Sequence, residues 1–157
     1  MTDSSTPRRD LDRVAGGLAA CLPVLLRALD RQVAAAYPHP KPPEGRLALL
    51  RYVAQHEGVT VREAAEALLM KPNNVSALVS QLTERGDLER RQDSADKRIA
   101  HLHLTAMARE RVAEVRELET AFIRQALTSL TEGEQGALGS AVGALEALAR
   151  HLHPAAR

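Results

Sequence analysis

Apolar residues recur three and four positions apart over most of the chain, which is the spacing of one face of an α-helix. The first such stripe consists of Leu11, Val14, Leu18, Leu22, Leu25, Leu29 and Val33. It predicts a long helix after a polar, mobile arm of residues 1–9. Gly16, Gly17 and Pro23 interrupt the stripe. Because proline removes a backbone hydrogen bond, we expect a kink near residues 19–23, or two helices in series.

The middle of the chain has short elements separated by turn signals. Four prolines in residues 37–43 predict a stiff linker. The next helix is expected over residues 44–55, with Gly58 as its C-terminal cap. Thr60 and Glu63 have the spacing of a capping box, which predicts a short helix through Leu69. Pro72 suits the first turn of a further helix that ends near residues 85–86.

After this helix the spacing of apolar residues changes from the helical period of three to four residues to the period of two residues that is typical of a strand. Residues 88–91 and 99–104 are strand candidates, and the loop between them carries the Asp and Ser residues typical of turns. We therefore expect a β-hairpin. In its second strand Ala100, Leu102 and Leu104 share one face, and Ile99, His101 and His103 share the other.

Two long helices follow the hairpin. Thr105 is the expected N-cap of the first, whose apolar side carries Val112, Val115, Phe122, Ile123, Leu127 and Leu130. Thr131 and Glu134 form a second capping box. The helix that starts there has an apolar seam, which consists of Leu138, Val142, Leu145, Leu148 and Leu152.

Composition supports a mainly α fold. The chain has 27 Ala and 23 Leu but only 13 Val and Ile together and three aromatic residues, which disfavours a β-sandwich or barrel. A formal charge of +1 gives no global sign of nucleic-acid binding, so that case depends on local arrangement. One cysteine, no signal-like N-terminus and no membrane-length apolar run lead us to expect a cytoplasmic protein without membrane contact.

The order helix, helix, turn, helix, hairpin is the pattern of a winged helix-turn-helix. The helix after Pro72 has Val75, Leu78, Val79 and Leu82 on one side. Its other side offers small polar groups, with no acidic residue from Lys71 to Thr83. Asn and Gln side chains are suited to pairing with adenine. This pattern predicts DNA binding, although an ordinary solvated helix face remains the alternative.

The segment from Thr60 to Thr105 resembles the DNA-binding core of the MarR family of bacterial transcription regulators. The strongest similarity is RGDLERRQDSADKR over residues 85–98, followed by IAHLHLT over residues 99–105. The long terminal helices resemble the family's dimerisation domain, so the resemblance spans about residues 8–153. It implies a homodimer on a pseudo-palindromic operator of double-stranded DNA, with Asp96 bracing the wing and Arg98 in the minor groove. Asp87 and Ala77 depart from the usual pattern.

These observations predict an arm of residues 1–9, a dimerisation region of residues 10–37 and 106–153, and a winged module of residues 44–105. The expected function is a dimeric repressor released by a small ligand or a stress signal. The family resemblance implies an effector site near residues 22–52, between the dimer helices and the winged module. The candidate DNA contacts, supported by Asp96, are Arg62, Lys71, Asn73, Asn74, Ser76, Ser80, Gln81, Arg90, Arg91, Lys97 and Arg98.

Other readings stay open at this point. A winged-helix module that binds protein instead of DNA is favoured slightly by Ala77, Asp87 and the low net charge. Cys21 suggests a redox-sensing regulator, as in one branch of the family, but its apolar neighbours favour simple packing. The histidine pairs at 101 and 103 and at 151 and 153 lack further metal ligands, so we expect solvated or phosphate-facing side chains, no metal and no cofactor. No motif supports an enzyme; a metal-dependent one would need bound zinc.

Overall fold

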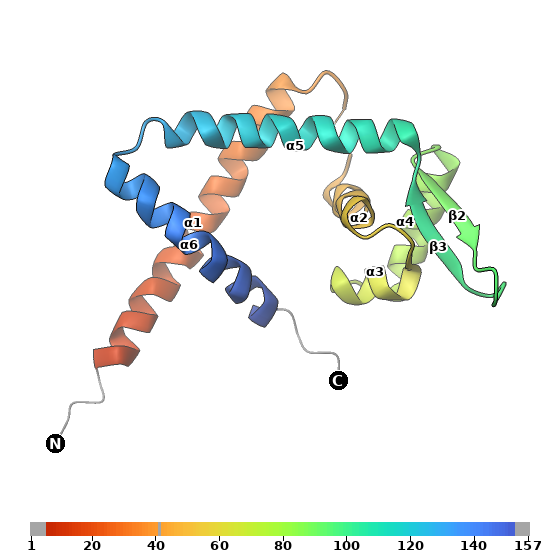
Figure 1. Ribbon diagram of the computed structural model, residues 1–157, viewed down its shortest axis with the longest axis horizontal. Coiled ribbons are helices and arrows are strands. Elements are labelled where there is room, and N and C mark those ends of the chain that lie inside the picture. The colour runs from red at the N-terminus through yellow and green to blue at the C-terminus, as the bar shows by residue number, and fades with distance from the viewer. Residues whose placement is uncertain (1–5, 41, 153–157) are drawn as a thin grey trace.

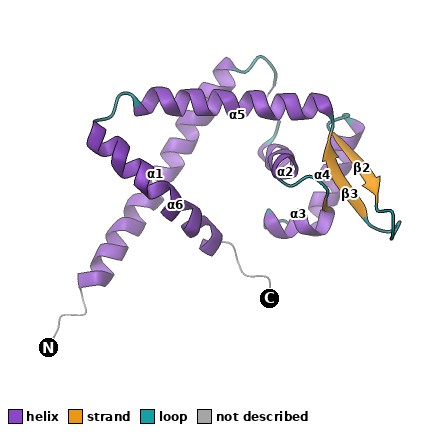
Figure 2. Ribbon diagram, viewed as in Figure 1, coloured by secondary structure: helices purple, strands orange, loops and turns teal. Residues whose placement is uncertain are grey.

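The winged helix-turn-helix class predicted from the sequence is confirmed by the computed structural model, which describes residues 6–40 and 42–152 (Figure 1). The three short helices and the sheet gather at one end of α5, and α1 and α6 lie toward the other (Figure 2). The elements are α1 (Thr6–Ala36), α2 (Glu44–Gln55), β1 (Val59–Thr60), α3 (Val61–Ala67), α4 (Pro72–Glu84), β2 (Leu88–Gln92), β3 (Ala100–Leu104), α5 (Ala106–Leu127) and α6 (Glu132–Leu152).

Helix α1 differs from its prediction in two ways. It is one continuous helix of 31 residues with Pro23 inside it, not two helices in series. Proline removes a single backbone hydrogen bond, and the Ala- and Leu-rich sequence on both sides of it favours the helix strongly. The helix also begins at Thr6, so residues 6–9 do not belong to the predicted arm; residues 1–5 of that arm lie outside the described residues.

The core of the winged module is built from α2, α3, α4 and the sheet. Val53, Val75 and Val79 are completely buried, and Leu102 of β3 packs into the same cluster. Leu102 and Leu104 are buried while His101 and His103 are less so, which confirms the alternation predicted for this strand. The burial of these side chains fixes the position of α4 against the hairpin.

The sheet has three antiparallel strands in the order β1-β3-β2, where the sequence predicted a hairpin only. The additional strand, β1, pairs Val59 with Leu102 and is two residues long, too short to show an alternating pattern. Gly58 is not the cap of α2, which ends at Gln55 and has His56 as its C-cap. Its positive φ of 83° instead turns the chain into β1, and its N–H donates to the Leu102 carbonyl at 3.0 Å.

The predicted helix starts are confirmed by side-chain hydrogen bonds. Thr60 and Glu63 form the capping box of α3, and Thr105 accepts from the Ala108 N–H at the start of α5. The second box is present as well, with the Thr131 N–H 2.8 Å from the Glu134 carboxylate. α3 ends two residues before the predicted Leu69, which has a left-handed φ of 55°.

The terminal helices bury little apolar surface within one chain. Val33 and Tyr37 pack on Val115 of α5, and Leu29, Leu118 and Phe122 complete this small cluster. The remaining apolar residues of α1 from Leu11 to Leu26 are largely exposed, and α6 has no buried residue among those described. No helix in the described ranges is both long and apolar enough to cross a membrane.

Candidate nucleic-acid interface

The polar face predicted for α4 is exposed along the whole helix. Lys71 precedes the helix, Pro72 occupies its first turn, and Asn73 and Asn74 follow. The exposed side chains that the sequence assigned to DNA are Lys71, Asn73, Asn74, Ser76, Ser80 and Gln81. The opposite face is held by Val75, Val79 and Leu82, so this orientation is fixed by the core.

The wing, defined here as residues 88–104, is attached to this face by a direct contact. The Arg90 guanidinium on β2 donates to the Ser80 hydroxyl on α4 at 3.1 Å. Ser80 in turn donates to the Ser76 carbonyl at 3.1 Å. The structure therefore brings Ser76, Ser80 and Arg90 together, and it joins helix and wing in one surface.

At the far end of the hairpin, Asp96 and Arg98 contact each other. The Asp96 carboxylate accepts from the backbone N–H of Arg98 at 3.0 Å and from its Nε at 3.3 Å. The Arg98 side chain is 93% exposed while Asp96 is 44% exposed. The Arg98 guanidinium thus extends from the loop, and its direction is set by the hydrogen bonds of Arg98 to Asp96.

Two of the other predicted cations are paired with carboxylates of the same chain. Arg62 on α3 pairs with Glu66 at 3.0 Å, one helical turn away. Arg91 pairs with Glu89 at 3.1 Å. Both pairs are exposed, so they are weak and can exchange for a phosphate. Lys97 is exposed beside Arg98.

Sequence reasoning missed the role of His101, for which we expected a solvated or phosphate-facing ring. The ring is half-buried, and its Nδ1 lies 2.5 Å from the Gly58 carbonyl while its Nε2 lies 3.0 Å from the Asp93 carboxylate. These contacts raise the pKa of His101, with the Asp93 hydrogen bond as the main cause. The pKa of Asp93 is lowered to about 2, chiefly by the Asp96 backbone N–H. Gly58 and His101 are 43 residues apart in the sequence, so local sequence patterns do not reveal their contact.

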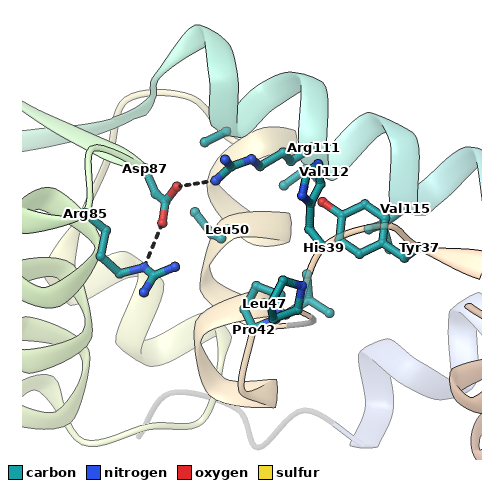
Figure 3. Close-up of a pocket in the computed structure, with 12 residues that line it drawn as sticks. Tyr37, His39, Pro42, Leu47, Leu50, Arg85, Asp87, Arg111, Val112 and Val115 are labelled. Carbon is teal, nitrogen blue, oxygen red and sulfur yellow. Dashed lines mark hydrogen bonds and ion pairs between the residues drawn. The ribbon is translucent and has the colours of Figure 1, made fainter. Parts of the chain in front are cut away.

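Asp87, which departs from the family pattern, is buried between two arginines (Figure 3). Its carboxylate accepts from Arg85 at 3.3 Å and lies 3.5 Å from the Arg111 guanidinium on α5. The backbone is anchored too, since the Asp87 N–H donates to Leu82 at 2.8 Å and its carbonyl accepts from Thr105 at 3.2 Å. Asp87 therefore joins the end of α4 to the start of α5, away from the exposed face of α4.

The same residues form one wall of a cavity of about 190 Å³ between the winged module and α5. Tyr37 and His39 lie on the side opposite Asp87, and Leu47 and Pro42 lie below them in the close-up (Figure 3). Burial is the main cause of the raised pKa of Tyr37. Within the segment predicted for an effector site, residues 22–52, the cavity is lined only by residues between Tyr37 and Leu50. Residues of α5 complete the lining, and none of residues 22–36 contributes.

Two further residues differ from or extend the predictions. Cys21 is exposed on α1, so the packed environment expected for it is not provided within one chain. Within the described ranges, His, Cys, Asp and Glu side chains form no group of three that suits a metal ion. Of the second histidine pair, His151 is exposed and His153 lies outside the described residues.

The fold and this surface define the chain as a winged helix-turn-helix protein. A sequence model described as MarR family matches residues 42–99, which contain the three short helices and most of the wing. The winged module of this chain thus matches the MarR family of winged helix regulators. No curated protein has a sequence that matches significantly.

Solved structures agree with this assignment at the level of the fold. FabT of Streptococcus pneumoniae in complex with DNA is 17% identical, with a TM-score of 0.73 over 90% of this chain and 99% of FabT. RV1404 of Mycobacterium tuberculosis is 19% identical, with a TM-score of 0.77 over 94% and 97%. A MarR family protein of Bacillus stearothermophilus is 16% identical, with a TM-score of 0.74 over 92% and 96%.

Proposed function

We propose that the chain is a dimeric, sequence-specific DNA-binding repressor that a small ligand releases from its operator. The observation that carries this proposal is the Arg90–Ser80 contact, which makes the polar face of α4 and the cationic wing one continuous surface. Such a surface matches a helix in the major groove with a wing over the adjacent minor groove. FabT, which shares this fold, has been solved in complex with DNA, and this supports DNA binding by the chain.

A DNA titration at several salt concentrations tests this function. Phosphate contacts release counterions, so the logarithm of the binding constant should fall linearly with the logarithm of the salt concentration. Genomic binding sites would supply the operator, and a random duplex of the same length is the control. Binding that ignores salt, or no binding to any duplex, contradicts the proposal and favours the protein-interaction alternative.

One observation weakens that alternative. In the sequence, Asp87 favours the alternative slightly because it replaces a residue that is usually apolar at the start of the strand. In the structure it is buried and paired with two arginines, so it presents no unpaired charge to DNA bound at α4. Ala77 remains as the departure on the exposed face of α4.

The wing gives the first mutational prediction. Arg98→Ala should weaken operator binding at least about tenfold, some 1.4 kcal/mol, because a guanidinium suits a narrow minor groove. The melting temperature should hardly change, since the Arg98 side chain is 93% exposed. Asp96→Ala should also weaken binding, although it removes a negative charge, because Arg98 loses its bracing partner.

Lys97→Ala is the matched control for this pair. It removes an adjacent exposed cation for which no contact with Asp96 is seen among the described residues, so it should cost less than Arg98→Ala. Equilibrium titrations at one salt concentration compare the three variants. Tighter binding by Asp96→Ala would show that Asp96 is only a repulsive charge.

The first turn of α4 gives a second prediction. Asn73→Ala and Asn74→Ala should each cost roughly 1–3 kcal/mol against the operator and little against random DNA, because a base contact carries sequence information. Competition titrations against both duplexes measure the difference. Equal losses on both would reassign these residues to phosphate contacts.

Dimerisation is inferred from apolar surface that one chain leaves uncovered. The seam of α6 is exposed, from 37% at Leu145 to 72% at Leu152. On α1, Val24, Leu25 and Leu26 are each at least 60% exposed. Monomers rarely expose so large a continuous apolar area, so we assign both helices to a two-fold interface. The operator half-sites would then lie about one helical turn, ~34 Å, apart.

The cavity beside Asp87 is the inferred effector site. It lies where the winged module meets α5, so a ligand there touches both parts at once. A ligand can shift the chain only if it binds one arrangement of these parts better than the other. Its walls combine Leu47, Leu50 and Val115 with polar groups at one end, which suits a small, mostly apolar molecule.

A further inference from the structure

His101 occupies an unusual position for a wing residue. It lies on β3, on the face opposite the buried Leu102, and directly across from Arg91 of β2 and Thr60 of β1. From there its ring reaches back to Gly58, before β1, and forward to Asp93, at the start of the wing loop. One side chain thus connects the body of the winged module to the loop that carries Arg98.

Both ring nitrogens of His101 face acceptors. The Gly58 carbonyl lies 2.5 Å from Nδ1, and Asp93 Oδ2 lies 3.0 Å from Nε2. A neutral imidazole has one N–H and can satisfy one acceptor, whereas the imidazolium has two N–H groups and satisfies both. The geometry therefore fits the protonated ring.

Asp93 links His101 to the wing loop through hydrogen bonds. Its Oδ1 accepts from the N–H of Ala95 at 2.7 Å and from that of Asp96 at 2.9 Å, while Oδ2 faces His101. Backbone bonds from Asp93 to Ile99 and from Ile99 to Asp96, both 2.9 Å, close the turn. Asp96 then holds Arg98. The hydrogen bonds run without a break from Gly58 through His101, Asp93 and Asp96 to the exposed guanidinium.

We propose that His101 is the residue that positions the wing loop, and that it does so in its doubly protonated form. The consequence for DNA rests on the proposed function: the wing should present Arg98 in a fixed direction when His101 is charged and lose that order when it is neutral. His101 is a positioning residue here, since its ring is occupied by protein groups on both sides.

The surrounding charges set the pH range in which this works. Asp93 on the wing loop and Glu63 on α3 favour the imidazolium, while Arg91 opposite it is paired with Glu89. Because the pKa of His101 is raised above 6.5 in the ordered wing, the contact is fully present below pH 6.5 and is lost as the pH rises through that raised value. Asp93, with a pKa of about 2, stays ionised throughout this range.

Asp93→Asn provides a sharp test. The Asn Oδ1 can still accept from the Ala95 and Asp96 N–H groups, but its Nδ2 now donates toward Nε2, which suits a neutral ring. Operator affinity of the unaltered chain should fall about tenfold from about pH 6 to about pH 8.5, the loss expected when Arg98 is no longer aimed. Asp93→Asn should remove that fall. His101→Gln should bind weakly and equally at both pH values.

His103→Gln is the matched control, because it removes a histidine from the same face of β3 and should keep the pH dependence. Ring ¹⁵N shifts of the DNA-free chain give an independent measurement: both His101 nitrogens should be protonated near pH 6, with a midpoint above 6.5 that the Asp96 amide shares. A midpoint below 6.5, or a His101→Gln variant with the original pH profile, would overturn the proposal. Failure to bind any duplex instead contradicts the proposed function, whatever the ring titration shows.

Discussion

Val142→Glu combined with Leu145→Glu should convert the protein to a monomer at micromolar concentration. Both side chains lie in the α6 seam, 53% and 37% exposed in the single chain. A two-fold interface would bury each carboxylate twice without a partner, at a cost of several kcal/mol. Light scattering measures the mass directly.

The same variant should lose at least about a hundredfold in operator affinity, because an unlinked module no longer gains from the second half-site. Ser140→Glu is the control: it places one carboxylate on the opposite side of α6 and should leave mass and affinity unchanged. A double variant that stays dimeric would place the interface elsewhere on the chain.

Replacing Arg85 and Arg111 together with alanine should lower the free energy of unfolding by about 3–5 kcal/mol. The Asp87 side chain is 8% exposed and keeps no cationic partner in that variant, so an unpaired carboxylate is left in the interior. Each single replacement should cost less, since the other guanidinium remains. Denaturant unfolding at neutral pH measures all three.

Asp87→Leu is the informative counterpart to that double variant. It removes the buried charge, while the two arginines, 56% and 42% exposed, can keep their contact with water. Its stability should equal or exceed that of the original chain, because well-packed apolar residues often replace buried ion pairs without loss. If Asp87→Leu is as unstable as the double arginine variant, the ion pairs themselves hold α4 to α5.

The features that could be predicted from the sequence are local ones. Thr60 and Glu63 are three residues apart, and their capping box depends on nothing else. The alternation in β3 likewise follows from one strand with one buried face. The exposed polar face of α4 was predictable because its apolar partners at Val75, Val79 and Leu82 have helical spacing.

The features that were missed depend on groups far apart in the chain. β1 is a strand only because Val59 reaches Leu102, and His101 has its role only because Gly58 and Asp93 converge on it. In the sequence, Asp87 is an unfavourable charge at the start of a strand. The fold brings Arg111 of α5 beside it and so provides a partner. Pro23 does not interrupt α1, because the helix-forming residues on both sides of it favour a continuous helix.

Helix α5 has a mechanical consequence for operator choice. Its 22 residues make a rod about 33 Å long, with the wing at one end and α6 at the other. A tilt of about 10° around the α6 end moves the wing end by about 6 Å, close to two base-pair steps along B-DNA. In the proposed dimer, the angle of α5 would therefore decide which half-site spacing fits. A change at the α1–α5 contact too small to disturb any side chain of the winged module would be enough to put both wings out of register with the grooves.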